Sequence, residues 1–116
     1  MDIIEEQKIL SGKYGSPFCE SSSLLKVGIS KNIKDGLWPI NGLRHPSIGD
    51  TTGWYIWAGE FSTEDDFFIP LHIEHLTDLC PVVLKYLGLA PGWRFLIAEN
   101  YEDVWEDKSL LNIDNQ

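Results

Sequence analysis

The chain has 116 residues, of which 43% are hydrophobic and 12% aromatic, and its formal net charge at pH 7 is −9. This length suits one domain, and the apolar fraction is too high for a disordered chain. No apolar run reaches the roughly 18 residues of a membrane-spanning helix, and the N-terminus lacks the basic and apolar regions of a signal peptide. Two cysteines, Cys19 and Cys80, do not make a disulfide framework. We therefore expect a cytoplasmic protein.

The negative charge is confined to the second half of the chain. Residues 1–58 carry six acids and six bases, whereas residues 59–116 carry twelve acids and three bases. An acidic surface repels nucleic acids and anionic lipids, because both bind through cationic contacts, and it attracts basic partners. We expect neither a nucleic-acid nor a membrane partner. The charge alone is also typical of ordinary solubility.

Residues 1–22 are predicted to form a peripheral N-terminal arm. Within it, residues 2–10 have the pattern of a short amphipathic helix that Ser11 and Gly12 end. The first strand is predicted at Leu24–Ser30, where apolar and polar residues alternate with the period of a half-buried strand.

A hairpin is predicted next. Asp35 and Gly36 form a turn signal, because glycine accepts the positive φ of tight turns, so residues 37–43 are expected to return antiparallel. Pro39 cannot donate to a strand ladder, which favours an edge position. Residues 53–59 form the next strand, with aromatic residues on both faces, so both faces are expected to be partly covered. Phe67 begins another short apolar segment, which is expected to stop at Pro70.

A helical stripe follows, at steps of three and four residues: Ile73, Leu76, Cys80, Val83 and Leu87. Pro81 interrupts the pattern, which predicts a kink or two short helices that meet at Cys80 and Pro81. Gly88 is the expected C-terminal cap.

Two further strands are predicted at residues 93–98 and 103–106, and residues 112–116 are expected to be a frayed tail. The order of strands, helix and strands predicts an α+β fold: a mainly antiparallel sheet with the kinked helix, or two short helices, packed on one face. We assign residues 23–111 to a single domain.

No catalytic constellation is evident in the sequence. His72 and His75 have a spacing that could bind a metal, but no third ligand stands in a recognised spacing with them. Cys80 lies on the apolar stripe, which is typical of a buried thiol rather than a reactive one. We expect no catalytic residue, metal or cofactor.

Two acidic clusters stand beside aromatic residues. Glu64, Asp65 and Asp66 form one, and Glu102 and Asp103 precede Trp105 in the other. An aromatic residue flanked by carboxylates suits a protein interface, in which the aromatic side chain anchors the partner and the acids steer it. The alternatives are a solvated loop for the first cluster and core packing for Trp105.

Several segments together resemble one bacterial family. They are Val27-Gly-Ile-Ser-Lys31, Asp35-Gly36, Leu43-Arg-His-Pro46, Thr52-Gly-Trp-Tyr-Ile-Trp-Ala-Gly59, Asp66-Phe-Phe-Ile-Pro-Leu-His72, Glu74-His-Leu76, Cys80-Pro81, Tyr86-Leu-Gly-Leu89, Pro91-Gly-Trp-Arg-Phe-Leu-Ile97 and Tyr101-Glu-Asp-Val-Trp105. In order and spacing they are similar to the immunity protein 33 family of polymorphic toxin systems, over roughly Leu24–Leu111. The resemblance implies a small α+β protein that neutralises a cognate toxin and brings no catalytic residues with it.

Two hypotheses follow. The first is a non-enzymatic protein that blocks a basic toxin by direct contact, with Glu64, Asp65, Asp66, Glu102, Asp103 and Trp105 as the candidate surface. The second is a small-molecule-binding or enzymatic domain in which Trp54, Trp57 and Trp93 line a pocket beside His72 and His75. The sequence gives no oligomeric state. The first hypothesis is preferred, because no acid–base pair or nucleophile stands out.

Overall fold

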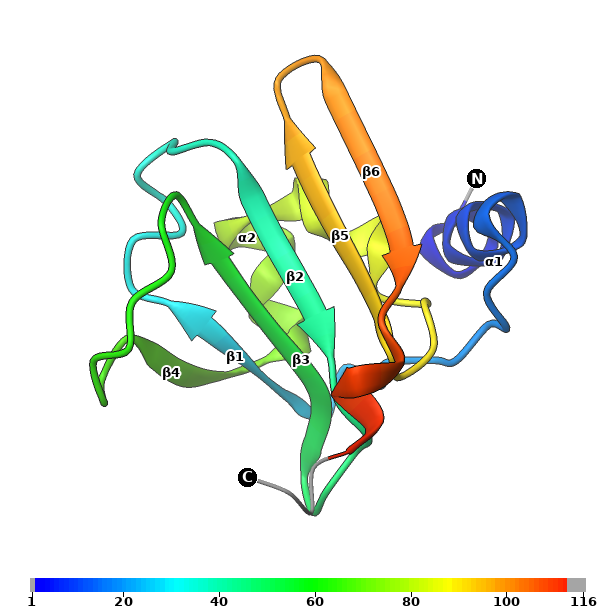
Figure 1. Cartoon of the computed structure of the whole chain (residues 1–116), viewed down its shortest axis with the longest axis horizontal. Coiled ribbons are helices and arrows are strands. Elements are labelled where there is room, and N and C mark those ends of the chain that lie inside the picture. Colours follow the sequence, from blue (N-terminus) through cyan, green and yellow to red (C-terminus); the bar gives the residue numbers. More distant parts are fainter. Residues whose placement is uncertain (1, 113–116) are drawn as a thin grey trace.

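Six strands form one mixed sheet in the computed structural model, which describes residues 2–112 (Figure 1). The strands are β1 (Lys26–Ser30), β2 (Ile40–Arg44), β3 (Thr51–Ala58), β4 (Phe68–His72), β5 (Trp93–Ala98) and β6 (Tyr101–Glu106). Their order across the sheet is β4-β1-β3-β2-β5-β6, so β4 and β6 are the two edges. β1 and β3 run parallel, and the other four neighbouring pairs are antiparallel. The prediction of an α+β fold with a mainly antiparallel sheet is confirmed.

Short helices between β4 and β5 cover one face of this sheet (Figure 1). They are η1 (Ile73–His75), α2 (Leu76–Leu79) and η2 (Pro81–Tyr86), and the helical path breaks at Cys80 and Pro81 as predicted. All five residues of the predicted stripe are buried: Ile73, Leu76, Cys80, Val83 and Leu87. Gly88 is not a left-handed cap, because its φ is not positive. A larger residue would not fit at position 88, because its Cβ would lie 2.8 Å from the Cβ of Gln7.

The N-terminal helix is longer than predicted. α1 (Ile3–Tyr14) begins where the Asp2 side chain accepts a hydrogen bond from the Glu5 amide at 2.9 Å, and it ends at Gly15, whose φ is 85°. The predicted end at Ser11 and Gly12 is wrong. A single glycine lowers helix stability without ending a helix that is packed against its neighbours, and here Leu10 and Ser11 are buried on the side that faces η2.

The predicted hairpin between residues 24–30 and 37–43 is wrong. β1 pairs with β3 and β4, whereas β2 pairs with β3 and β5. β2 is therefore an inner strand, and it begins at Ile40, so Pro39 lies just outside its ladder. Pro70, rather than Pro39, is the proline that occupies an edge strand, and it lies in the middle of β4 opposite Gly28. The predicted end of this segment at Pro70 is therefore wrong, because β4 continues to His72.

The central strand β3 divides the sheet into its two faces. Trp54 and Ile56 point toward the helices and are 1% and 0% exposed, and they pack with strand residues such as Ile29 and Phe95. Tyr55 and Trp57 point the other way, because successive strand residues alternate between faces. Both faces of this strand were expected to be partly covered, and this is confirmed. On the face away from the helices Trp57 is buried, whereas Tyr55 is exposed.

Arg44 is a buried cation that the sequence does not reveal. Its side chain is 1% exposed, and it donates to the carbonyl oxygens of Thr52, Cys19 and Leu89 at 2.9, 2.9 and 2.7 Å. Burial lowers the pKa of its guanidinium. These bonds tie the segment after α1 to β3 and to the turn before β5.

After β6, η3 (Lys108–Leu111) returns across the end of the sheet and buries Leu110, whose carbonyl oxygen lies 2.9 Å from His45 Nδ1. Of the predicted tail, residues 113–116 lie outside the described part of the chain. Within residues 2–112, no helix combines the length and apolar character that crossing a membrane requires.

Candidate protein-binding surface

The first acidic cluster lies on the loop between β3 and β4. Glu64, Asp65 and Asp66 are all exposed. Asp66 accepts a hydrogen bond from Lys31 Nζ at 2.8 Å, which lowers the pKa of its carboxyl group. Within residues 2–112, Glu64 and Asp65 form no ion pair. Two unpaired carboxylates therefore stand next to a neutralised one.

Glu102 does not belong to an exposed cluster. It shares a face of β6 with the buried Val104, and it points toward the helices. The hydroxyl groups of Tyr14 and Tyr86 both donate to its carboxylate, and Lys13 and Lys85 lie 3.4 and 3.8 Å away. Burial favours the neutral acid, but these hydrogen bonds and the charge of Lys13 outweigh it, so the pKa of Glu102 is lowered. Glu102 thus joins α1, η2 and β6 inside the domain.

Asp103 and Trp105 lie on the opposite face of β6. Asp103 is exposed, and Trp105 is half-buried with the guanidinium of Arg94 5.4 Å above its ring. Arg94 also lies 3.5 Å from the carboxylate of Asp107. Trp105 therefore lies on the sheet face away from the helices, where a partner can reach it.

The two acidic clusters are not brought together. The loop that carries Glu64, Asp65 and Asp66 leads into β4, and Asp103 and Trp105 are on β6, so the whole width of the sheet separates them (Figure 1). What lies between them is the sheet face that the helices leave uncovered, which we call the open face.

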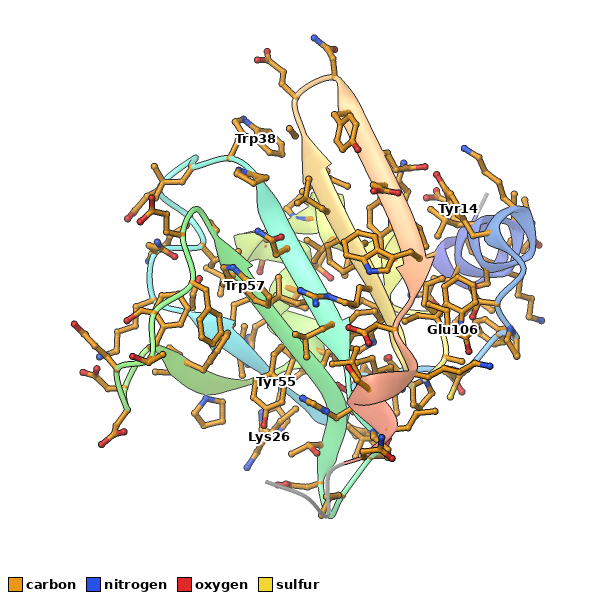
Figure 2. The ribbon with its side chains drawn as sticks, viewed as in Figure 1. Tyr14, Lys26, Trp38, Tyr55, Trp57 and Glu106 are labelled. Atoms are coloured by element: carbon orange, nitrogen blue, oxygen red, sulfur yellow. The ribbon has the colours of Figure 1, made fainter. Side chains whose placement is uncertain are left out.

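Six rings form a connected aromatic cluster on the open face: His45, Tyr55, Trp57, Phe61, Phe67 and Phe68. Tyr55 and Trp57 lie two positions apart on β3 and therefore share one face of the strand (Figure 2). The Tyr55 ring lies 5.2 Å from that of Phe68, and the Trp57 ring lies 5.3 Å from that of Phe61, both edge to face. Edge-to-face contacts at such distances stabilise aromatic clusters. Tyr55 remains 39% exposed and Phe61 56% exposed.

Five of these rings, all except that of Phe67, line a groove of about 710 Å³ on the open face, which we call the aromatic groove. Its floor is β3, and Ile48 and Phe61 stand on its walls, both more than half exposed. Gly28 lets the Tyr55 ring lie against β1, because a Cβ there would be 2.7 Å from that ring. The lining is more apolar than polar, and His45, Thr51 and the hydroxyl group of Tyr55 are its polar side-chain groups.

The predicted pocket of Trp54, Trp57 and Trp93 is wrong. Residues three apart on a strand point to opposite faces, so Trp54 faces the helices while Trp57 faces the groove. Trp93 is also buried, at 9% exposure. The signal that could have found the groove is the same alternation, which places Tyr55 with Trp57. It also places Glu102 with Val104, away from Trp105.

His72 and His75 do not line the aromatic groove. Both are exposed, with ring centroids 6.3 Å apart, and within residues 2–112 no group of three or more His, Cys, Asp or Glu residues could hold a metal ion. Cys80 is buried, which raises the pKa of its thiol. That is the setting of an inert core thiol.

These features define a small α+β domain with one helix-covered face and one open face of aromatic character. The model of the Imm33-like domain family matches residues 6–107. The chain belongs to the Imm33-like domain family, as the resemblance in the sequence predicted. The family name places the chain among immunity proteins, whose partners in general are cognate toxins. No curated protein and no solved structure matches the chain.

Proposed function

We propose that the chain is a non-enzymatic, cytoplasmic immunity protein that neutralises a cognate bacterial toxin by direct protein–protein contact through an acidic face. Membership of the Imm33-like domain family supports the role. The observation that carries the contact is the uncompensated negative charge of the exposed loop between β3 and β4, where Glu64 and Asp65 have no basic partner among the described residues.

The charge favours a basic toxin. Complementary charges accelerate association and bias the choice of partner, and their effect weakens as salt screens it. Asp66, Asp103 and Trp105 remain in the proposed surface with Glu64 and Asp65. Glu102 is the least suited of the original candidates, because the fold itself occupies its carboxylate.

The experiment uses the protein encoded by the reading frame next to this gene as the probe. Wild type is expected to bind it, and the affinity is expected to fall as ionic strength rises. The double substitution Glu64→Lys and Asp65→Lys should weaken binding and flatten this salt dependence. The matched control is Glu5→Lys with Asp78→Lys, which changes the net charge equally on exposed positions of α1 and α2. Equal affinity and salt dependence in all three proteins would refute the acidic face.

The small-molecule alternative keeps one observation in its favour. The aromatic groove has a volume within the range of about 300–1,000 Å³ that ligand pockets span. It contains His45 rather than His72 or His75. Native mass spectrometry of the purified protein tests this alternative, which predicts a retained ligand that the Tyr55→Ala variant loses.

A further inference from the structure

We propose that the aromatic groove is the central contact for the toxin, and that it receives apolar side chains from a basic segment of that protein. This inference rests on the proposed function and adds the part of the surface that carries most of the affinity. The acidic loop then forms one rim of the interface, and Asp103 with Trp105 forms the other.

The first argument is the exposure of large aromatic side chains in a concave site. Phe61 is 56% exposed although it contacts Trp57, Phe67 and Phe68, and Tyr55 is 39% exposed on the groove floor. Aromatic residues in such settings dominate binding energies, because they bury much apolar area at little cost in side-chain entropy. A groove of about 710 Å³ accommodates several side chains of a partner.

The second argument is charge complementarity at the rim. The loop that carries Phe61 also carries four carboxylates, those of Glu60, Glu64, Asp65 and Asp66, and no base. Lys31 pairs with Asp66, which leaves three negative charges on the loop that supplies Phe61 to the groove wall. At the other end, Lys26 and Asp50 neutralise each other across 2.9 Å. An apolar centre with a negative rim fits a segment that carries apolar and basic side chains together.

The third argument is the alternation of β3. Trp54 and Ile56 already bury the helix-facing side of this strand completely, so the core under the helices does not require aromatic residues on the other side. There Trp57 is covered by Phe61 and Phe68, whereas Tyr55 remains 39% exposed. Together with Ile48 and Phe61, Tyr55 gives the groove exposed apolar surface, and contiguous surface of this kind marks a contact with another molecule.

The test measures affinity for the neighbouring gene's product with two groove variants, Phe61→Ala and Ile48→Lys. Both side chains are more than half exposed, so neither change is expected to unfold the domain. Each should weaken binding at least about tenfold, as loss of a central interface residue does. Ile9→Ala on α1 is the matched control, since Ile9 is 59% exposed on a helix that packs against η2, and it should bind as wild type does.

The outcomes separate this inference from the function on which it rests. Toxin binding that survives both groove variants but is lost with Glu64→Lys and Asp65→Lys would overturn the groove and leave the acidic face standing. Absence of any complex with wild type would overturn both. A change of self-association in the groove variants, with toxin affinity unaltered, would assign the groove to a second copy of this chain and overturn the inference. Loss of binding in both variants, with Ile9→Ala intact, supports it.

Discussion

Glu102 and Arg44 are charged residues that the fold uses internally, and each connects segments far apart in the sequence. Glu102 receives the hydroxyl groups of Tyr14 and Tyr86, so one carboxylate fixes α1 and η2 to the edge strand β6. Arg44 donates to three backbone carbonyl oxygens, those of Thr52, Cys19 and Leu89, and the Thr52 oxygen also accepts a hydrogen bond from the Ser47 hydroxyl group. Buried polar groups stabilise a fold only when they are paired in this way.

The substitution Glu102→Gln should lower the free energy of unfolding by about 1–3 kcal/mol at pH 7, because an amide replaces the charged acceptor of two tyrosine hydroxyl groups. The pKa of Glu102 is lower in the folded protein than in the unfolded chain. Its contribution is therefore complete above the unfolded carboxyl pKa of about 4.3, and it is lost as the pH falls through the folded pKa. Urea unfolding at pH 7 and at acidic pH measures both effects. A difference between the two proteins that does not change with pH would contradict this assignment.

Arg44→Met should destabilise the domain by about 2–6 kcal/mol, because the carbonyl oxygens of Cys19 and Leu89 lose this donor at about 1–3 kcal/mol each. Arg44→Lys keeps the charge but has one nitrogen in place of the guanidinium fork, so it should recover only part of the loss. Urea unfolding midpoints of the three proteins give the comparison. Wild-type stability in Arg44→Met would show that these bonds contribute nothing.

At the scale of elements, the sequence predicts which segments are regular better than it predicts how they pair. Residues 93–98 form the predicted strand, and the break at Pro81 is where the proline requires it. The predicted hairpin at Asp35 and Gly36 does not form, because turn residues describe local backbone geometry and the partners of β1 lie 25 to 46 residues further along the chain. Alternation within β3 and β6 predicts which residues share a face, and it reveals the open face once it is applied to Tyr55 and Trp57.

Two glycine substitutions should have opposite effects. Gly12 lies inside α1, and beyond its chain neighbours and the helix backbone no atom lies within 4 Å of a new Cβ, so Gly12→Ala should stabilise the domain by about 0.5–1 kcal/mol. Gly53→Ala should destabilise it strongly, because φ is +90° and the new Cβ would overlap with the backbone carbonyl group of His45. Thermal unfolding of both variants measures the two signs. Stabilisation by Gly53→Ala would contradict the strand geometry at the groove floor.

At the scale of the whole molecule, the carboxylates of the two predicted clusters lie in three places. Glu64, Asp65 and Asp66 lie near one edge of the sheet, Asp103 lies on the other edge, and Glu102 points into the domain. Composition predicts the sign of the surface charge, but it does not predict that Glu102 turns inward or that the sheet width separates Asp65 from Asp103. Those positions depend on strand order, which arises from contacts between distant segments. The apolar region between the two edges could be found only after the strands had been placed.

The most direct test of the proposed function is a titration of the neighbouring toxin's activity with the purified protein. Wild type should abolish that activity at an equimolar ratio and elute with the toxin as a single complex in gel filtration. Toxin that stays fully active in the presence of excess wild-type protein, with no complex formed, would contradict neutralisation by direct contact.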